Sequence, residues 1–276
     1  MPQYLAGAKI NLGLSVLGKL PNGYHELHTI FAALEVADRI ELEPTAEGIQ
    51  LEIVNSALPS GPSNLAYRAA RDYLEAAGWP GGVRMVLEKH LPLAAGLGGG
   101  SSDAAAVLRG LNELYPANLD LSALALKLGA DVPFFLGSPL AEGRGIGEKL
   151  RPLPPMPLEV VLVNPGIAVA AADAYKGLRR EEWSPELNVG DVLGALRAGQ
   201  EPPYWNTLEG PVSRLEPSLA EVKLELRKAG LFGILMSGSG STLFGLAKDA
   251  DEAAFIAGKL RARHPNFWIQ DTRTVV

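Results

Sequence analysis

The sequence contains no cysteine among its 276 residues. Its absence excludes disulfide bonds, thiolate metal sites, iron–sulfur clusters and cysteine nucleophiles. No run of 18 apolar residues occurs, so we expect no membrane-spanning helix and no membrane partner. The first four residues also lack the basic region of a secretory signal, which favours a cytoplasmic protein.

An excess of basic residues is also missing. The chain has 25 Lys and Arg against 31 Asp and Glu, a formal net charge of −6. A nucleic-acid-binding domain usually presents a basic surface, so we expect no nucleic-acid partner. Anionic small molecules remain possible ligands because backbone amides bind phosphate without any charged side chain.

The hydrophobic pattern indicates a mixture of strands and helices. Apolar residues alternate from Ala8 to Leu17, which predicts a half-buried strand. The same reasoning predicts further strands at 27–36, 39–43, 50–54, 83–87, 158–163, 234–236, 243–246 and 267–272. It predicts helices at 63–77, 104–114, 121–128, 170–178, 189–197, 218–229 and 251–263. Strict βαβ alternation is lacking, so the fold class is α+β.

A proline-rich segment offers the best domain boundary. Residues 151–157 contain four prolines, which predicts a stiff linker. We therefore expect an N-terminal domain over residues 1–153 and a C-terminal domain over residues 154–276.

A glycine-rich loop precedes the alanine-rich helix. Residues 96–102 read Gly-Leu-Gly-Gly-Gly-Ser-Ser. Glycine lets backbone N–H groups approach a phosphate, and a helix that starts behind the loop adds its positive dipole end. Ser101 or Ser102 is expected to cap that helix. The alternative is a turn that only lets a strand meet a helix closely.

Two familiar nucleotide loops do not fit this segment. A Walker loop needs a lysine after its last glycine, where this chain has Ser101. The dinucleotide fingerprint needs a third glycine in phase with Gly96 and Gly98, and that position is again Ser101. The chain is therefore neither a P-loop NTPase nor a Rossmann dehydrogenase.

Three ordered motifs resemble those of the GHMP kinases, the family of galactokinase, homoserine kinase, mevalonate kinase and phosphomevalonate kinase. The motifs are residues 8–12, the loop 92–105 and the late segment 236–242. The resemblance implies a two-domain GHMP kinase fold. Its N-terminal domain would be like ribosomal protein S5 domain 2, and its C-terminal domain would be ferredoxin-like. It also implies a small-molecule kinase that uses ATP and Mg²⁺, although the sequence identifies no magnesium ligand.

Further segments narrow the resemblance within the family. Residues 23–27, 128–135 and 143–148 resemble members that phosphorylate the 2-hydroxyl of a cytidyl-diphosphate derivative of methylerythritol, in the non-mevalonate isoprenoid pathway. In those members the turn before residue 24 usually carries Arg and Asp, where this chain has Leu20 and Asn22. The resemblance implies that ATP contacts Asn64, Leu93, Ala94, Ala95, Gly96, Leu97, Gly98, Gly99, Gly100, Ser101, Ser102 and Asp103.

Asp131 and Lys9 are the catalytic candidates. Phosphoryl transfer needs charge neutralisation and usually a base. Asp131 follows the predicted end of a helix. It is either an ordinary turn residue or the catalytic base, and the resemblance favours the base. Lys9 interrupts the apolar strand and shares a side with Asn11 by parity. It is either a solvated lysine or a cation that keeps Asp131 ionised and polarises the acceptor.

The acceptor candidates are Asn11, Tyr24, His25 and Tyr175. Asn11 would orient the acceptor, with a polar strand-edge residue as the alternative. Tyr24 and His25 follow a turn and would recognise the base, and Tyr175 would add an aromatic face or pack in the core. Asn64 either caps the helix that follows it or contacts the nucleotide.

Two other functions compete with this one. The first is a GHMP kinase with another acceptor, such as homoserine or mevalonate, which residues 23–25 disfavour. The second is a non-catalytic nucleotide sensor on the same fold, which would need neither Lys9 nor Asp131.

Overall fold

The structure, a computed structural model, describes residues 2–276 and divides the chain into two compact units. The first unit combines the chain up to Ala8 with residues 37–91 and 98–138. The second combines residues 9–36, 92–97 and 139–276. Each unit is thus built from separated stretches of sequence, and the division after residue 153 stays a prediction.

Two long strands belong partly to each unit. They are β1 (Gln3–Lys19) and β2 (His25–Thr45). The two strands expected at 27–36 and 39–43 are one, because Asp38 lies inside β2 instead of ending it. The half-buried strand expected at 8–17 is also wrong, since residues 8–16 are buried on both faces. Polar residues of β1 therefore lie in the interior.

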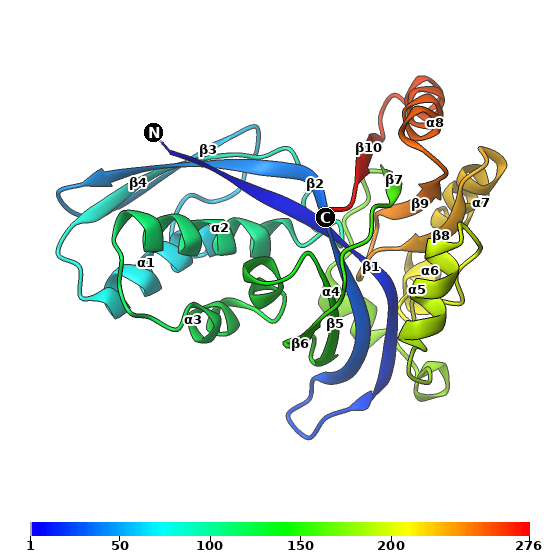
Figure 1. Ribbon diagram of the computed structural model, residues 1–276, viewed down its shortest axis with the longest axis horizontal. Coiled ribbons are helices and arrows are strands. Elements are labelled where there is room, and N and C mark those ends of the chain that lie inside the picture. The colour runs from blue at the N-terminus through cyan, green and yellow to red at the C-terminus, as the bar shows by residue number, and fades with distance from the viewer. Residues whose placement is uncertain (1) are drawn as a thin grey trace. The chain divides into compact units, whose positions relative to one another are not determined.

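In the first unit, helices cover one face of a small sheet (Figure 1). The second half of β2 pairs antiparallel with β4 (Gly82–Glu88), which pairs parallel with β3 (Ile49–Val54). The helices are α1 (Leu65–Ala77), α2 (Gly99–Leu114), α3 (Leu121–Leu128) and the 3₁₀ helix η1 (Val132–Leu136). Their apolar faces and the strands form one core around the fully buried Tyr73.

The second unit contains the first half of β2 and a separate four-stranded sheet. That half of β2 pairs with β5 (Leu140–Gly145), which pairs with β6 (Lys149–Pro152). The other sheet is antiparallel in the order β10 (Trp268–Arg273), β7 (Glu159–Asn164), β9 (Leu243–Ala247), β8 (Phe232–Met236). Helices α7 (Leu219–Lys228) and α8 (Ala250–Arg263) pack on it (Figure 1). The remaining elements are α4 (Ala171–Lys176), η2 (Arg180–Glu182), α5 (Val189–Arg197) and α6 (Glu209–Leu215).

Most predicted elements are confirmed within a few residues, and the misses have local causes. The expected linker at 151–157 begins inside β6, because Pro152 lies at the end of that strand, where its missing N–H costs nothing. Helix α6 was missed because Gly210 and Pro211 indicate a loop, yet proline is tolerated in a first helical turn. None of the helices within residues 2–276 combines the length and apolar character needed to cross a membrane.

Candidate active site

The predicted nucleotide loop divides at Gly98, and its first part lies in the second unit packed against protein. Ala94 and Gly96 have φ angles of 49° and 75°. The Gly96 carbonyl accepts a 2.9 Å hydrogen bond from Ser237 Oγ. A Cβ on Gly96 would lie 2.0 Å from the Ser237 carbonyl oxygen, so only glycine fits. The late glycine segment, residues 236–242, therefore packs against this part of the loop.

The second part of the loop, in the first unit, is the start of α2. The helix begins at Gly99 rather than near Ala104, with Gly98 at the N-cap, φ 71° and no side-chain capping bond. The expected capping by Ser101 or Ser102 is wrong, since both lie inside the first turns. A Cβ on Gly100 would meet nothing within 4 Å. A first turn without a side-chain cap is suited to an anion.

Asp103 belongs to a buried ion cluster below this turn. Its side chain is 2% exposed and accepts a 2.8 Å bond from Lys89 Nζ, which also ion-pairs with Asp38. Burial raises the pKa of Asp103 to about 7 although Lys89 opposes the rise. Asp38 in turn accepts the backbone N–H groups of His90 and Leu91, at 2.6 and 2.8 Å. The cluster therefore fixes the chain that leads into the loop.

Sequence reasoning missed Lys89 and Asp38. Asp38 sits in a strand and Lys89 at the end of another, where either would pass for a solvated residue. The only available signal is that Asp38 lies among buried strand residues and that Lys89 directly follows a strand with buried apolar residues. A Cβ on Gly99 would lie 3.5 Å from both Lys89 Nζ and Asp38 Oδ2, so the cluster lies directly beneath the first turn of α2.

Lys9, in the second unit, is 3% exposed, so the solvated-lysine alternative is wrong. Its Nζ donates a 2.7 Å hydrogen bond to Asn11 Oδ1, which confirms that the two share a side of β1. Asn11 is 1% exposed, so it is not a strand-edge residue. Lys9 Nζ also lies 5.6 Å from the ring centroid of Phe31. The strand thus encloses a cation and an amide in direct contact.

The late glycine segment lies against Lys9. A Cβ on Gly238 would be 3.1 Å from Lys9 Nζ. The Asn206 amide donates to the carbonyls of Met236 and Gly238, at 2.8 and 2.7 Å, and its oxygen accepts the Leu208 N–H at 2.9 Å. Sequence reasoning missed Asn206, which precedes α6 without any motif that marks it. Its three bonds hold Gly238 in place over the lysine.

Asp131 lies in the first unit, partly buried, immediately before η1. Its backbone is helical, with φ −84° and ψ −17°, and the Val132 N–H bonds back to the Gly129 carbonyl at 3.2 Å. The turn is therefore well defined, and Pro133 follows it as the sequence indicates. The pairing of Asp131 with Lys9 stays a prediction.

The structure brings two of the predicted base-recognition residues together. The rings of His25 and Tyr175 stack with centroids 5.2 Å apart and planes 20° apart. Partial burial, helped by the nearby Lys19, lowers the pKa of His25, so the ring is neutral at neutral pH. Tyr24, which precedes His25 in sequence, is 61% exposed. The Asn22 side chain accepts the Tyr24 N–H at 3.1 Å, a bond that Asp would also accept.

Asn64 caps α1, which confirms the first of the two interpretations given for it. Its side-chain oxygen accepts the Ala66 N–H at 2.9 Å, and its amide donates to the Pro59 carbonyl at 3.0 Å. A nucleotide contact by Asn64 stays a prediction.

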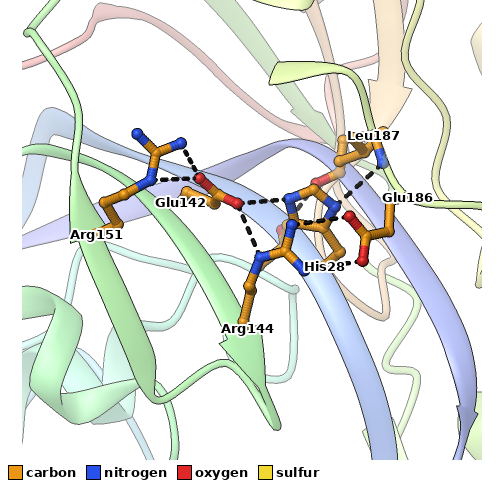
Figure 2. Close-up of polar contacts among 8 residues, drawn as sticks. His28, Glu142, Arg144, Arg151, Glu186 and Leu187 are labelled. Carbon is orange, nitrogen blue, oxygen red and sulfur yellow. Dashed lines mark hydrogen bonds and ion pairs between the residues drawn. The ribbon is translucent and has the colours of Figure 1, made fainter. Parts of the chain in front are cut away.

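A second buried network crosses the second unit (Figure 2). The His28 ring lies between Glu142 Oε1, at 2.9 Å from Nε2, and the Leu187 N–H, at 3.1 Å from Nδ1. Because Nδ1 accepts, Nε2 carries the proton and donates to Glu142. Burial raises the pKa of Glu142, but hydrogen bonds from Arg151 and Arg144 outweigh it and lower the pKa overall. The network ties β2 and β5 to the segment before α5.

Within residues 2–276, no three His, Asp or Glu side chains come together as a metal site. A magnesium ion that enters with nucleotide phosphates needs few protein ligands, because it keeps several waters.

Comparisons with known proteins match both halves of the chain. Residues 64–138 match the GHMP kinases N terminal domain and residues 188–266 the GHMP kinases C terminal domain. The chain is 55% identical to 4-diphosphocytidyl-2-C-methyl-D-erythritol kinase of Thermus thermophilus, over 94% of this chain and 92% of that protein. It is 49% identical to the protein of that name from Deinococcus radiodurans, over 96% and 91%. A crystal structure of 4-(cytidine 5'-diphospho)-2C-methyl-D-erythritol kinase superposes with a TM-score of 0.91 at 52% identity, covering both chains fully.

Proposed function

The chain belongs to the GHMP kinase family, and from this premise we propose that it phosphorylates the 2-hydroxyl of 4-diphosphocytidyl-2-C-methyl-D-erythritol with ATP. It is a small-molecule kinase with the mixed α and β content and two-domain fold of that family. We infer that the reaction is a step of the non-mevalonate isoprenoid pathway, as the resemblance to these kinases implies.

The observation that carries the proposal is the burial of Lys9. Enclosing an ammonium group is costly unless negative charge compensates for it, and this chain also fixes the group with Asn11 at 2.7 Å. A fixed, desolvated cation stabilises charge that develops on a phosphoryl group or an acceptor oxygen. A nucleotide sensor would gain nothing from it.

The proposed transfer assigns a role to each group. The backbone N–H groups of Gly98 to Gly100 hold the ATP phosphates at the start of α2. Asp131 accepts the proton of the 2-hydroxyl as that oxygen bonds to the γ-phosphorus and the bond to ADP breaks. Lys9 stabilises the negative charge, and Asn11 orients the acceptor. Mg²⁺, which we propose enters with ATP, supplies charge neutralisation.

The cytidyl group is proposed to bind at His25 and Tyr175. A neutral histidine donates one hydrogen bond to N3 of cytosine, and an aromatic ring stacks on the base. Tyr24 supplies a further ring from the turn. The two small-molecule substrates are then the partners of the enzyme, and we infer that it works in the cytoplasm.

The decisive experiment measures ADP release with Mg-ATP and four acceptors: the cytidyl-methylerythritol, mevalonate, homoserine and galactose. Turnover with the first alone is expected. Asp131→Asn should bind ATP and lower turnover by roughly 10²–10⁴. Turnover with another acceptor, or with none of the four, would overturn the proposal. Lys9→Met combined with Asp131→Asn tests whether these residues act as a unit, in which case their losses are not additive.

Base recognition has its own test. kcat/KM for the cytidyl acceptor is compared with that for its uridyl analogue, in the wild type and in His25→Ala. Uracil presents a donor where cytosine presents an acceptor, so the wild type should prefer cytosine. His25→Ala should lose that preference. An unchanged preference in the variant would place recognition elsewhere.

A further inference from the structure

The hydroxyl of Thr29 completes a hydrogen-bonded chain that starts at Lys9. Thr29 lies on β2 and is fully buried. Its Oγ1 accepts a 2.7 Å hydrogen bond from Asn11 Nδ2 and donates another, also 2.7 Å, to the carbonyl of Gly13. Asn11 Oδ1 accepts the Lys9 Nζ bond. All four residues lie in the second unit.

The direction of every bond in this chain is determined. Lys9 has only donors, so Asn11 must turn its oxygen toward the lysine and its amide toward Thr29. The Gly13 carbonyl has only lone pairs, so the Thr29 proton goes to it and the hydroxyl oxygen remains free to accept from Asn11. A reversed amide would place an NH₂ group against the ammonium of Lys9.

The far end of this hydrogen-bonded series, the Gly13 carbonyl, is fixed as well. Gly13 has φ 105°, and a Cβ there would lie 2.9 Å from Leu187 Cδ1. The Leu187 N–H is bonded to His28, whose ring is held by Glu142 (Figure 2). The Gly13 carbonyl therefore has little freedom to move, and it provides a rigid anchor for the hydroxyl.

From these contacts we propose that Thr29 is a positioning residue for Lys9. Its hydroxyl accepts from Nδ2 and so fixes the position of the Asn11 amide, and that amide holds the ammonium group in place. The inference rests on the proposed function, since it matters for catalysis only if Lys9 acts there. It assigns Thr29 no contact with either substrate.

The test replaces the hydroxyl and keeps the shape. Thr29→Val removes both bonds with little change of volume, and Thr29→Ser retains the hydroxyl. Misplacing a catalytic group by about 1 Å costs up to ~100-fold in rate. We expect Thr29→Val to lower kcat by roughly 10- to 100-fold with the KM for ATP unchanged. Thr29→Ser should restore kcat to within about threefold of the wild type, because it rebuilds both bonds.

A matched control separates positioning from stability. Thr274 is also buried in the second unit, and its hydroxyl accepts the Leu158 N–H at 2.9 Å and donates to the Met156 carbonyl. Thr274→Val should lower the melting temperature about as much as Thr29→Val and leave kcat unchanged. A similar kcat loss in both variants would overturn the inference, as would wild-type kcat in Thr29→Val.

Failure of the proposed function would appear in the wild type, as no turnover with the cytidyl acceptor. The positioning inference then has a readout of its own. In a crystal structure of Thr29→Val, the Asn11 amide should shift from its present position and Lys9 Nζ should move with it. An amide and lysine that stay in place would overturn the inference whatever the acceptor is.

Discussion

The two parts of the glycine loop differ in what surrounds them. At Gly96 an added Cβ would lie 2.0 Å from the Ser237 carbonyl oxygen, whereas at Gly100 it would meet nothing within 4 Å. Both are glycines of one motif, yet protein fills the space at the first and leaves it open at the second. The first glycine serves the packing of the second unit, and the second leaves room for a ligand at the start of α2.

Gly96→Ala should have the largest effect on the fold. The methyl group would collide with backbone, and alanine at φ 75° is strained in addition. We expect a loss of about 3 kcal/mol or more in the free energy of unfolding, measured by denaturant titration. Wild-type stability in this variant would show that the packed part of the loop adapts easily.

Gly100→Val should separate ligand binding from stability. The side chain enters open space, so the free enzyme should unfold near the wild-type denaturant concentration. ATP affinity, measured by calorimetry, should fall by about tenfold or more because the branched side chain keeps phosphate from the backbone.

The matched control is Gly194→Val in α5, where an added Cβ also meets nothing within 4 Å. It should leave ATP affinity unchanged. If ATP affinity survives in Gly100→Val, the open part of the loop is not the phosphate site, and the contrast with Gly96 has only a structural meaning.

Asp103 lies in the cluster beneath the open part and should make stability depend on pH. The pKa of Asp103 in the folded protein, about 7, lies above the ordinary value of 3.8, so the native state holds an extra proton between these two pH values. Stability contributed by this group is therefore present at low pH and lost as pH rises toward 7. Asp103→Asn should remove this slope, measured as melting temperature from pH 5 to pH 8. An identical slope in the variant would assign it to other groups.

Ser237→Ala should have the smallest effect. It removes the hydrogen bond to the Gly96 carbonyl and leaves the glycine backbone intact. We expect a loss of about 1 kcal/mol in the free energy of unfolding and unchanged ATP affinity. A loss as large as that of Gly96→Ala would mean that the hydrogen bond, rather than the steric fit, holds the packed part.

The sequence predicted the helices and strands better than it predicted the contacts between them. Periodicity located α1 within two residues, because its buried residues recur every three to four positions and that spacing is visible in the sequence itself. It divided β2 at residues 37–38, since a charged Asp38 indicates a break when its backbone partners at 90 and 91 are unknown. The start of α2 was placed too late because glycine has a low helix propensity, although its backbone tolerates a first turn.

The candidate site shows the same limit. Family motifs indicated Lys9, Asn11 and His25, and parity placed the first two on one side of the strand. Nothing local marks Thr29 or Asn206 as partners, because their bonds join residues far apart in sequence. Such partners become visible only when strands pair and loops pack.

The discontinuous make-up of the units has a consequence for protein synthesis. Every residue of the first unit has been translated once the chain reaches residue 138. The second unit needs β10, which pairs with β7 and ends at Arg273. On the ribosome, domains fold as their residues emerge. The first unit can therefore fold once residue 138 has emerged, whereas residues 9–36 of the second must wait until residue 273 has been translated.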